Sequence, residues 1–136
     1  MLKSKMITEA LRPFKKDKKL KISNLIYKVD KKEFYDKNVV KVVFDNNFNA
    51  LYYSRSPIPF KNFKNAYKQI AIIPFRKDFL FKYLKMKETN LEKIESVDMM
   101  RILENNEKIK LVITKFNTYS VDTPQDLKKV SRLINV

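Results

Sequence analysis

The stretch with the clearest capacity for chemistry is Ser120–Leu127, which reads Ser-Val-Asp-Thr-Pro-Gln-Asp-Leu. Thr123 is a suitable helix N-cap, and Pro124 suits the first helical position. The apolar run Lys110–Thr114 is a predicted buried strand, so Asp122 is expected at a strand-to-helix junction. A carboxylate there could hold a hard cation beside a ligand, or it could merely favour the positive end of the helix dipole.

Composition removes several kinds of chemistry. Among 136 residues there is no Gly, His or Cys. Without Cys there is no disulfide or thiolate metal site, and without His acid–base chemistry is left to carboxylates, Lys or Tyr. Phosphate-binding loops of the GxGxxG and Walker types need glycine for positive φ and close backbone approach. The sequence therefore predicts that this chain holds no nucleotide in either of these ways.

The charge balance is strongly positive, with 30 Lys and Arg against 15 Asp and Glu and a net charge of +15. That balance is compatible with a basic nucleic-acid-binding domain. However, the chain has only five Arg, the residue that does most base-edge and bidentate phosphate recognition. The dense basic run Lys15–Lys21 is interrupted by Asp17, which favours a solvated linker. We therefore expect no nucleic-acid partner.

The apolar runs are short. None approaches the length that spans a bilayer, and the start Met1–Met6 lacks the apolar core of a signal peptide. We therefore expect no membrane partner and a cytoplasmic product.

Alternating helix and strand patterns indicate an α/β fold class in one domain. The predicted helices are Ser4–Leu11, Lys31–Tyr35, Arg76–Tyr83, Leu91–Asn105 and Pro124–Ile134. The predicted strands are Ile22–Val29, Val39–Phe44, Ala50–Ser54, Lys68–Phe75 and Lys108–Thr114. Pro13 is expected to stop the first helix, and Pro74 is expected near a strand end. The polar run Asp45–Asn49 predicts the turn of a β-hairpin.

Four segments, in this order, resemble the cytidylyltransferases that make CMP-activated acidic sugars. They are Val39–Val43 with Ala50–Pro59, Lys68–Arg76, Leu91–Asn105 and Ser120–Leu127. The resemblance covers the chain from Met6 onward and is greatest for CMP-Kdo (3-deoxy-manno-octulosonate) synthetases, with CMP-N-acylneuraminate synthetases more distant. It implies the C-terminal part of a nucleotide-diphospho-sugar-transferase-like, Rossmann-like mixed sheet with flanking helices and a dimerisation hairpin.

The resemblance also implies what this chain lacks. Members of the family begin with a glycine-containing loop that binds the CTP phosphates, and a later Asp in a Gly-Asp-Glu-Pro-like loop supplies one magnesium ligand. Residues 1–136 are therefore expected to be the C-terminal portion of a single cytidylyltransferase domain, with the N-terminal CTP-binding portion absent. A truncated reading frame, one half of a split enzyme and a degenerate homologue all remain open. Missing strands would leave unpaired edges, so we expect self-association or stabilisation by a complementary N-terminal half.

The family reaction joins CMP from CTP to the anomeric hydroxyl of an acidic sugar such as Kdo and releases pyrophosphate. The resemblance implies that Mg²⁺ is the cofactor, that Asp122 is one of its ligands and that the enzyme is a homodimer. Arg55 would face an anionic sugar or phosphate, and a buried ion pair is the alternative. Gln69 stands where Kdo enzymes carry a sugar-contacting His. Its amide can hydrogen-bond a hydroxyl but does not titrate near neutral pH.

On the predicted long helix, Glu95, Asp98 and Arg101 recur every three residues and share a face. The resemblance assigns Asp98 to substrate binding, while Met99 replaces an amide, which leaves the identity of the sugar open. An Asp98–Arg101 pair on a solvated helix face is the alternative. We expect the chain alone to be inactive. A non-catalytic remnant or assembly module, and a basic nucleic-acid-binding domain, remain alternative functions.

Overall fold

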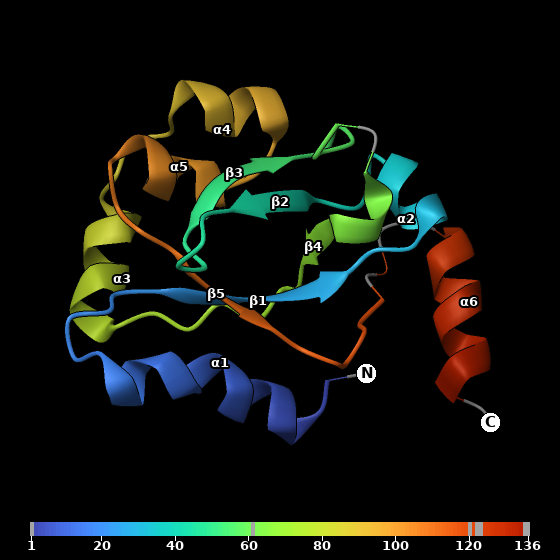
Figure 1. Cartoon of the computed structure of the whole chain (residues 1–136), viewed down its shortest axis with the longest axis horizontal. Helices are drawn as coiled ribbons and strands as arrows, with labels where there is room; N and C mark the ends of the chain where they lie inside the picture. The colour runs from blue at the N-terminus through green and yellow to red at the C-terminus, as the bar shows by residue number, and fades with distance from the viewer. Residues whose placement is uncertain (1, 61, 120, 122–123, 135–136) are drawn as a thin grey trace.

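Five strands form one mixed sheet, and helices cover both of its faces (Figure 1). The strands are β1 (Ser23–Lys28), β2 (Lys41–Phe44), β3 (Ala50–Ser54), β4 (Tyr67–Gln69) and β5 (Lys110–Ile113). The helices are α1 (Ser4–Lys16), α2 (Lys31–Tyr35), α3 (Lys77–Leu84), α4 (Asn90–Glu95), α5 (Met99–Glu104) and α6 (Pro124–Ile134), with a 3₁₀ turn η1 at Phe63–Asn65. No helix in the described ranges combines the length and apolarity needed to cross a bilayer.

This computed structural model describes residues 2–60, 62–119, 121 and 124–134. The side chains of Gln125, Lys129, Leu133 and Ile134 lie outside the description. Asp122 and Thr123 also lie outside the described residues, so the cation ligand and the helix cap predicted there stay predictions.

The sheet has the strand order β3-β2-β4-β1-β5. The pair β1–β5 is parallel, and every other neighbouring pair is antiparallel. The predicted hairpin is β2–β3, and its turn is held by the Asp45 carboxylate, which accepts backbone N–H bonds from Asn47 at 2.9 Å and Asn49 at 2.8 Å. The predicted α/β fold class is thus confirmed.

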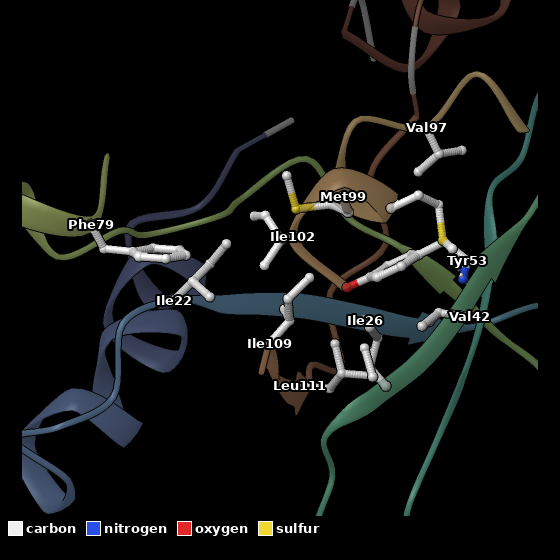
Figure 2. Close-up of a cluster of buried hydrophobic side chains, with 12 residues drawn as sticks. Ile22, Ile26, Val42, Tyr53, Phe79, Val97, Met99, Ile102, Ile109 and Leu111 are labelled. Carbon is white, nitrogen blue, oxygen red and sulfur yellow. Dashed lines mark hydrogen bonds between the residues drawn. The ribbon is translucent and has the colours of Figure 1, made fainter. Parts of the chain in front are cut away.

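The core follows from the period-2 alternation of β1. Ile22 and Ile26 point to one face, where they join side chains of α3 and α5, while Leu25 points to the opposite face and packs with Met6 and Ala10 of α1. Figure 2 shows the first cluster, in which residues of β1, β3, α3 and α5 converge. The two faces of the sheet therefore have separate hydrophobic clusters.

Helix α1 does not stop at Pro13, contrary to the expectation above. It continues to Lys16, and the backbone N–H of Asp17 still donates to the Pro13 carbonyl at 2.9 Å. Proline removes its own N–H, but its carbonyl can accept normally. Because Met6 and Ala10 are buried against the sheet, packing offsets the lost bond.

The strand predicted at Lys68–Phe75 is shorter than expected, since β4 ends at Gln69. The buried side chain of Asn24 explains the change: its Nδ2 donates to the carbonyls of Ile70 at 2.7 Å and Ile72 at 3.3 Å. The Ile72 N–H turns back to the Ile70 carbonyl at 2.7 Å. The Asn24 amide thus takes the Ile70 carbonyl, and the backbone N–H of Leu25 bonds to the Ile72 carbonyl at 3.2 Å instead, so regular pairing ends at Gln69.

The helix predicted at Leu91–Asn105 is two helices, α4 and α5. Ser96 has a left-handed backbone (φ 52°, ψ 48°), and the Val97 N–H donates to the Glu92 carbonyl at 3.2 Å, as at a helix C-terminus. The prediction that Glu95, Asp98 and Arg101 share one helix face is therefore wrong.

Candidate functional site

The Glu95 corner (Tyr52, Ser54, Arg55 and Glu95) joins the end of β3 to the end of α4. The Glu95 carboxylate accepts hydrogen bonds from the Tyr52 hydroxyl at 3.0 Å, the Ser54 hydroxyl at 3.1 Å and the Arg55 backbone N–H at 3.0 Å. Hydrogen bonds to a charged acceptor are stronger than neutral ones. The corner therefore fixes the bend at which β3 leaves the sheet.

Arg55, a predicted substrate-binding residue, lies in this corner. Its guanidinium donates to three backbone carbonyls: Lys37 at 3.1 Å, Glu95 at 3.0 Å and Ser96 at 3.0 Å. Arginine has five N–H donors, so two of them have no partner within residues 2–60, 62–119, 121 and 124–134 and could serve a ligand. The guanidinium makes no ion pair with a carboxylate among the described residues, so carbonyls organise the loop in place of the ion pair considered above. Binding of an anionic ligand by Arg55 stays a prediction.

Asp98, the second predicted substrate-binding residue, is exposed at the start of α5 and makes no capping hydrogen bond through its side chain. Burial raises the pKa of the Tyr53 phenol, and the negative charge of Asp98 raises it further. The Tyr53 hydroxyl donates to Asn24 Oδ1 at 3.1 Å. Asp98 thus offers an exposed carboxylate acceptor at the start of α5.

Gln69, the third predicted substrate-binding residue, ends β4 and is half-buried. Its backbone N–H donates to the Val40 carbonyl at 2.9 Å. Strand register places Tyr53 opposite Val42 and Val42 opposite Tyr67, so Gln69, two residues after Tyr67, shares their sheet face. Arg55 is bonded to the Ser96 carbonyl, two residues before Asp98, and Gln69 lies on the sheet face that α5 covers.

The partner of Arg101 is Glu92, so the Asp98–Arg101 pair considered above does not form. The guanidinium binds the carboxylate with two bonds, Nη2–Oε1 at 2.5 Å and Nε–Oε2 at 2.7 Å. Both side chains are largely buried, with 16% and 10% of their surface exposed. This bidentate pair joins α4 to α5 and so sets where Asp98 lies.

The Glu92–Arg101 pair predicts an acid-sensitive contribution to stability. The Arg101 guanidinium holds the pKa of the Glu92 carboxyl below its ordinary value of 4.5, so its contribution is present above that pH and is lost as the pH falls through the folded-state pKa. We expect Arg101→Met to cost about 3 kcal/mol at pH 7 and less below pH 4. Thermal unfolding of the wild-type protein and of Arg101→Met between pH 3 and pH 7 measures how the difference in stability depends on pH.

Lys93→Met is the matched control, because Lys93 follows Glu92 on α4 and forms an exposed pair with Glu88 at 3.9 Å. It should barely change the melting temperature at any pH. An offset between wild type and Arg101→Met that stays constant from pH 3 to pH 7 would contradict the assigned linkage.

Lys41 and Lys68 are buried on the sheet face opposite to α5, and the sequence analysis did not predict their burial. Lys41 Nζ donates to the carbonyls of Asp36 at 2.8 Å, Val39 at 2.7 Å and Arg55 at 2.5 Å, and burial lowers the pKa of Lys41 to about 8. Lys68, its neighbour across the sheet, pairs with Glu33 at 2.5 Å. The sequence feature that could have indicated the burial of Lys41 is its position as the only charged residue in the apolar run Val39–Phe44.

Comparison with known proteins decides the family. A family model described as cytidylyltransferase matches residues 1–109 of this chain. The chain belongs to the cytidylyltransferase family. It is 41% identical over 138 residues to the 3-deoxy-manno-octulosonate cytidylyltransferase of Fusobacterium nucleatum, and that alignment covers 98% of this chain. It is 37% identical to the enzyme of the same name from Thermodesulfovibrio yellowstonii, with 99% of this chain covered.

The fold of this cytidylyltransferase chain agrees with a solved relative. A structure of CMP:2-keto-3-deoxy-manno-octonic acid synthetase complexed with CTP superposes with a TM-score of 0.89 and 29% identity over 99% of this chain. This match confirms the resemblance and the predicted fold. The chain spans 56% of the length of the two curated relatives and 57% of the solved chain.

Proposed function

We propose that this chain is the sugar-binding and metal-binding part of a cytidylyltransferase that activates an acidic sugar such as 3-deoxy-manno-octulosonate. The reaction consumes CTP and releases pyrophosphate. The observation that carries the proposal is the match of nearly the whole chain to enzymes of this name, together with the solved relative bound to CTP. The net charge of +15 suits both anionic substrates, because it attracts them to the protein.

In this proposal the side chains of Arg55, Asp98 and Gln69 position the sugar. Asp98 accepts hydrogen bonds from sugar hydroxyls, and Gln69 donates to or accepts from another hydroxyl. The two remaining N–H groups of Arg55 meet an anionic group of a substrate. Holding the sugar in this way aims its anomeric hydroxyl at the α-phosphorus, in line with the leaving pyrophosphate. Both acidic and amide groups orient the sugar, and neither has to change protonation for that role.

The proposal includes Mg²⁺ as the cofactor, with Asp122 as one of its ligands. Among the residues that the structure describes, no three acidic side chains form a group that could hold a metal ion. One carboxylate from this chain fits such a site only if further ligands come from elsewhere, since Mg²⁺ is commonly held by one or two carboxylates plus substrate phosphates. When bound, the ion would neutralise charge on the phosphoryl oxygens.

The nucleotide-binding loop is assigned to a companion part, meaning a polypeptide equivalent to the portion of the relatives that this chain does not span. The chain has no glycine for a phosphate cradle and spans 56% of its curated relatives. We take the companion part to be the N-terminal, CTP-binding portion. The assembled enzyme is proposed to be a cytoplasmic homodimer.

Pyrophosphate release tests the proposal. The chain is mixed with CTP, Kdo and Mg²⁺, with and without the companion part taken from the Fusobacterium nucleatum relative. We expect no turnover from the chain alone, because the phosphate cradle is missing, and Kdo-dependent turnover from the mixture. Turnover by the chain alone would refute the requirement for a companion. A stable complex without turnover would favour a non-catalytic assembly module.

A further inference from the structure

The segment 70–75, which follows β4, has one bonded edge and one open edge. Backbone hydrogen bonds of 2.9 to 3.2 Å join it to residues 23–25 of β1. On the other side, the N–H groups of Ala71, Ile73 and Phe75 make no hydrogen bond within the part of the chain that the structure describes. Strand β2 does not cover them, because its pairing with β4 is limited to Tyr67 and Lys68. Unpaired N–H groups along a strand-like segment are a template for another strand.

This edge differs from the outer edges of the sheet in its chemistry. The stretch Gln69–Phe75 contains no charged residue. By contrast, β5 begins with Lys110 and is soon followed by Lys115, and Arg55 follows β3. Lysine and arginine at an edge discourage pairing with other chains. The composition therefore favours addition of a strand at segment 70–75 over addition at β3 or β5.

One flank of α1 extends this edge as an apolar surface. Ile7 and Leu11 lie four residues apart on the helix, and each has 43% of its surface exposed. Glu9, on the opposite flank, accepts a hydrogen bond from Thr114 beyond β5 at 2.7 Å. Ile7 and Leu11 therefore turn away from β5. At the end of this flank the Phe14 carbonyl accepts a bond from Arg76 at 3.3 Å, which places the flank beside segment 70–75.

We propose that the open edge of segment 70–75 and the α1 flank form the docking surface for the companion part, which adds a strand at the edge and covers Ile7 and Leu11. This inference rests on the proposed function. The length of the solved relative is consistent with such an occupant: this chain covers 57% of that chain with a TM-score of 0.89, which leaves 43% (100% − 57%) of the solved chain that this chain does not span. An uncharged, unpaired edge beside exposed aliphatic side chains is the surface that such a segment would bury.

A binding measurement with purified proteins tests this surface. The companion part of the Fusobacterium nucleatum relative is titrated into the full chain and into the double variant Ile7→Glu/Leu11→Glu. Burying two new carboxylates should weaken binding at least about 30-fold. The matched control is Leu84→Glu/Ile94→Glu, at positions with 65% and 67% exposure in α3 and α4, and it should bind within about threefold of wild type.

Amide hydrogen exchange reports on the edge itself. The N–H groups of Ala71, Ile73 and Phe75 should exchange rapidly in the chain alone and at least about tenfold more slowly in the complex. Equal binding by both double variants, unchanged exchange at these amides, absence of binding, or burial of the surface by a second copy of the chain would each overturn the inference. A complex that docks here but releases no pyrophosphate would leave the docking surface standing and remove the proposed activity.

Discussion

Asp122→Asn in this chain is expected to lower pyrophosphate release by the enzyme assembled with its companion part at least about 100-fold. Asparagine keeps the shape of the side chain but removes the negative charge that a hard cation requires. Poorer neutralisation of the phosphoryl oxygens raises the barrier, and each tenfold loss of rate corresponds to about 1.4 kcal/mol. Initial rates measured against Mg²⁺ concentration give the effect, and the variant should need far more Mg²⁺ for half-maximal rate.

Asp126→Asn is the matched control, because the same change is made four residues further on, within α6. It should keep most of the activity and leave the Mg²⁺ dependence unchanged. Complex formation should be the same for both variants, since neither residue belongs to segment 70–75 or to α1. If Asp122→Asn retains wild-type activity and Mg²⁺ dependence, Asp122 is not a magnesium ligand.

Periodic and local features were predictable from the sequence. The strand predicted at Ile22–Val29 contains β1, in which successive residues such as Leu25 and Ile26 pack on opposite faces of the sheet. The predicted helix start at Leu91 is within one residue of the observed start of α4 at Asn90, where Thr89 is the N-cap and the Glu92 carboxylate accepts from its N–H at 3.2 Å. In each case residues a few positions apart determine the outcome.

Features that depend on distant residues were not predictable. A single helix was predicted over Leu91–Asn105, yet the helix breaks at Ser96. There the guanidinium of Arg55, at the end of β3, donates to the carbonyls of Glu95 and Ser96. Likewise, β4 is short because Asn24, more than forty residues away, binds the carbonyls that follow it. Tertiary contacts overrode local propensity at both places.

The candidate site shows the same division. The resemblance pointed to Arg55, which lies in the matching segment Ala50–Pro59, but not to the three carbonyls that accept hydrogen bonds from its guanidinium. Asp98 was expected in mid-helix beside Arg101. Its real position at the joint of α4 and α5 follows from the Glu92–Arg101 pair, which spacing alone did not distinguish from an Asp98–Arg101 pair. Asp122 was predicted as a metal ligand from its expected position at a strand-to-helix junction and from the family resemblance.

Glu95→Ala is expected to be the most destabilising single substitution in the Glu95 corner. It removes the shared acceptor of the Tyr52 hydroxyl, the Ser54 hydroxyl and the Arg55 backbone N–H, so partly buried donors lose their partner. Unsatisfied buried donors cost about 1–3 kcal/mol each, and these three are coupled, so we expect a total of about 3 kcal/mol. That loss corresponds to a melting temperature lower by roughly 10 °C.

Two further variants separate the hydrogen bonds from the loss of side-chain volume. Glu95→Gln keeps one carbonyl acceptor, but its amide N–H group faces the hydrogen-bond donors of β3. Its melting temperature should therefore lie between those of wild type and Glu95→Ala. Glu88→Ala is the control, because Glu88 is 64% exposed in a weak pair with Lys93. It should leave the melting temperature nearly unchanged. If Glu95→Ala melts like Glu88→Ala, the carboxylate does not hold the end of β3 to α4, and the position of Arg55 must have another cause.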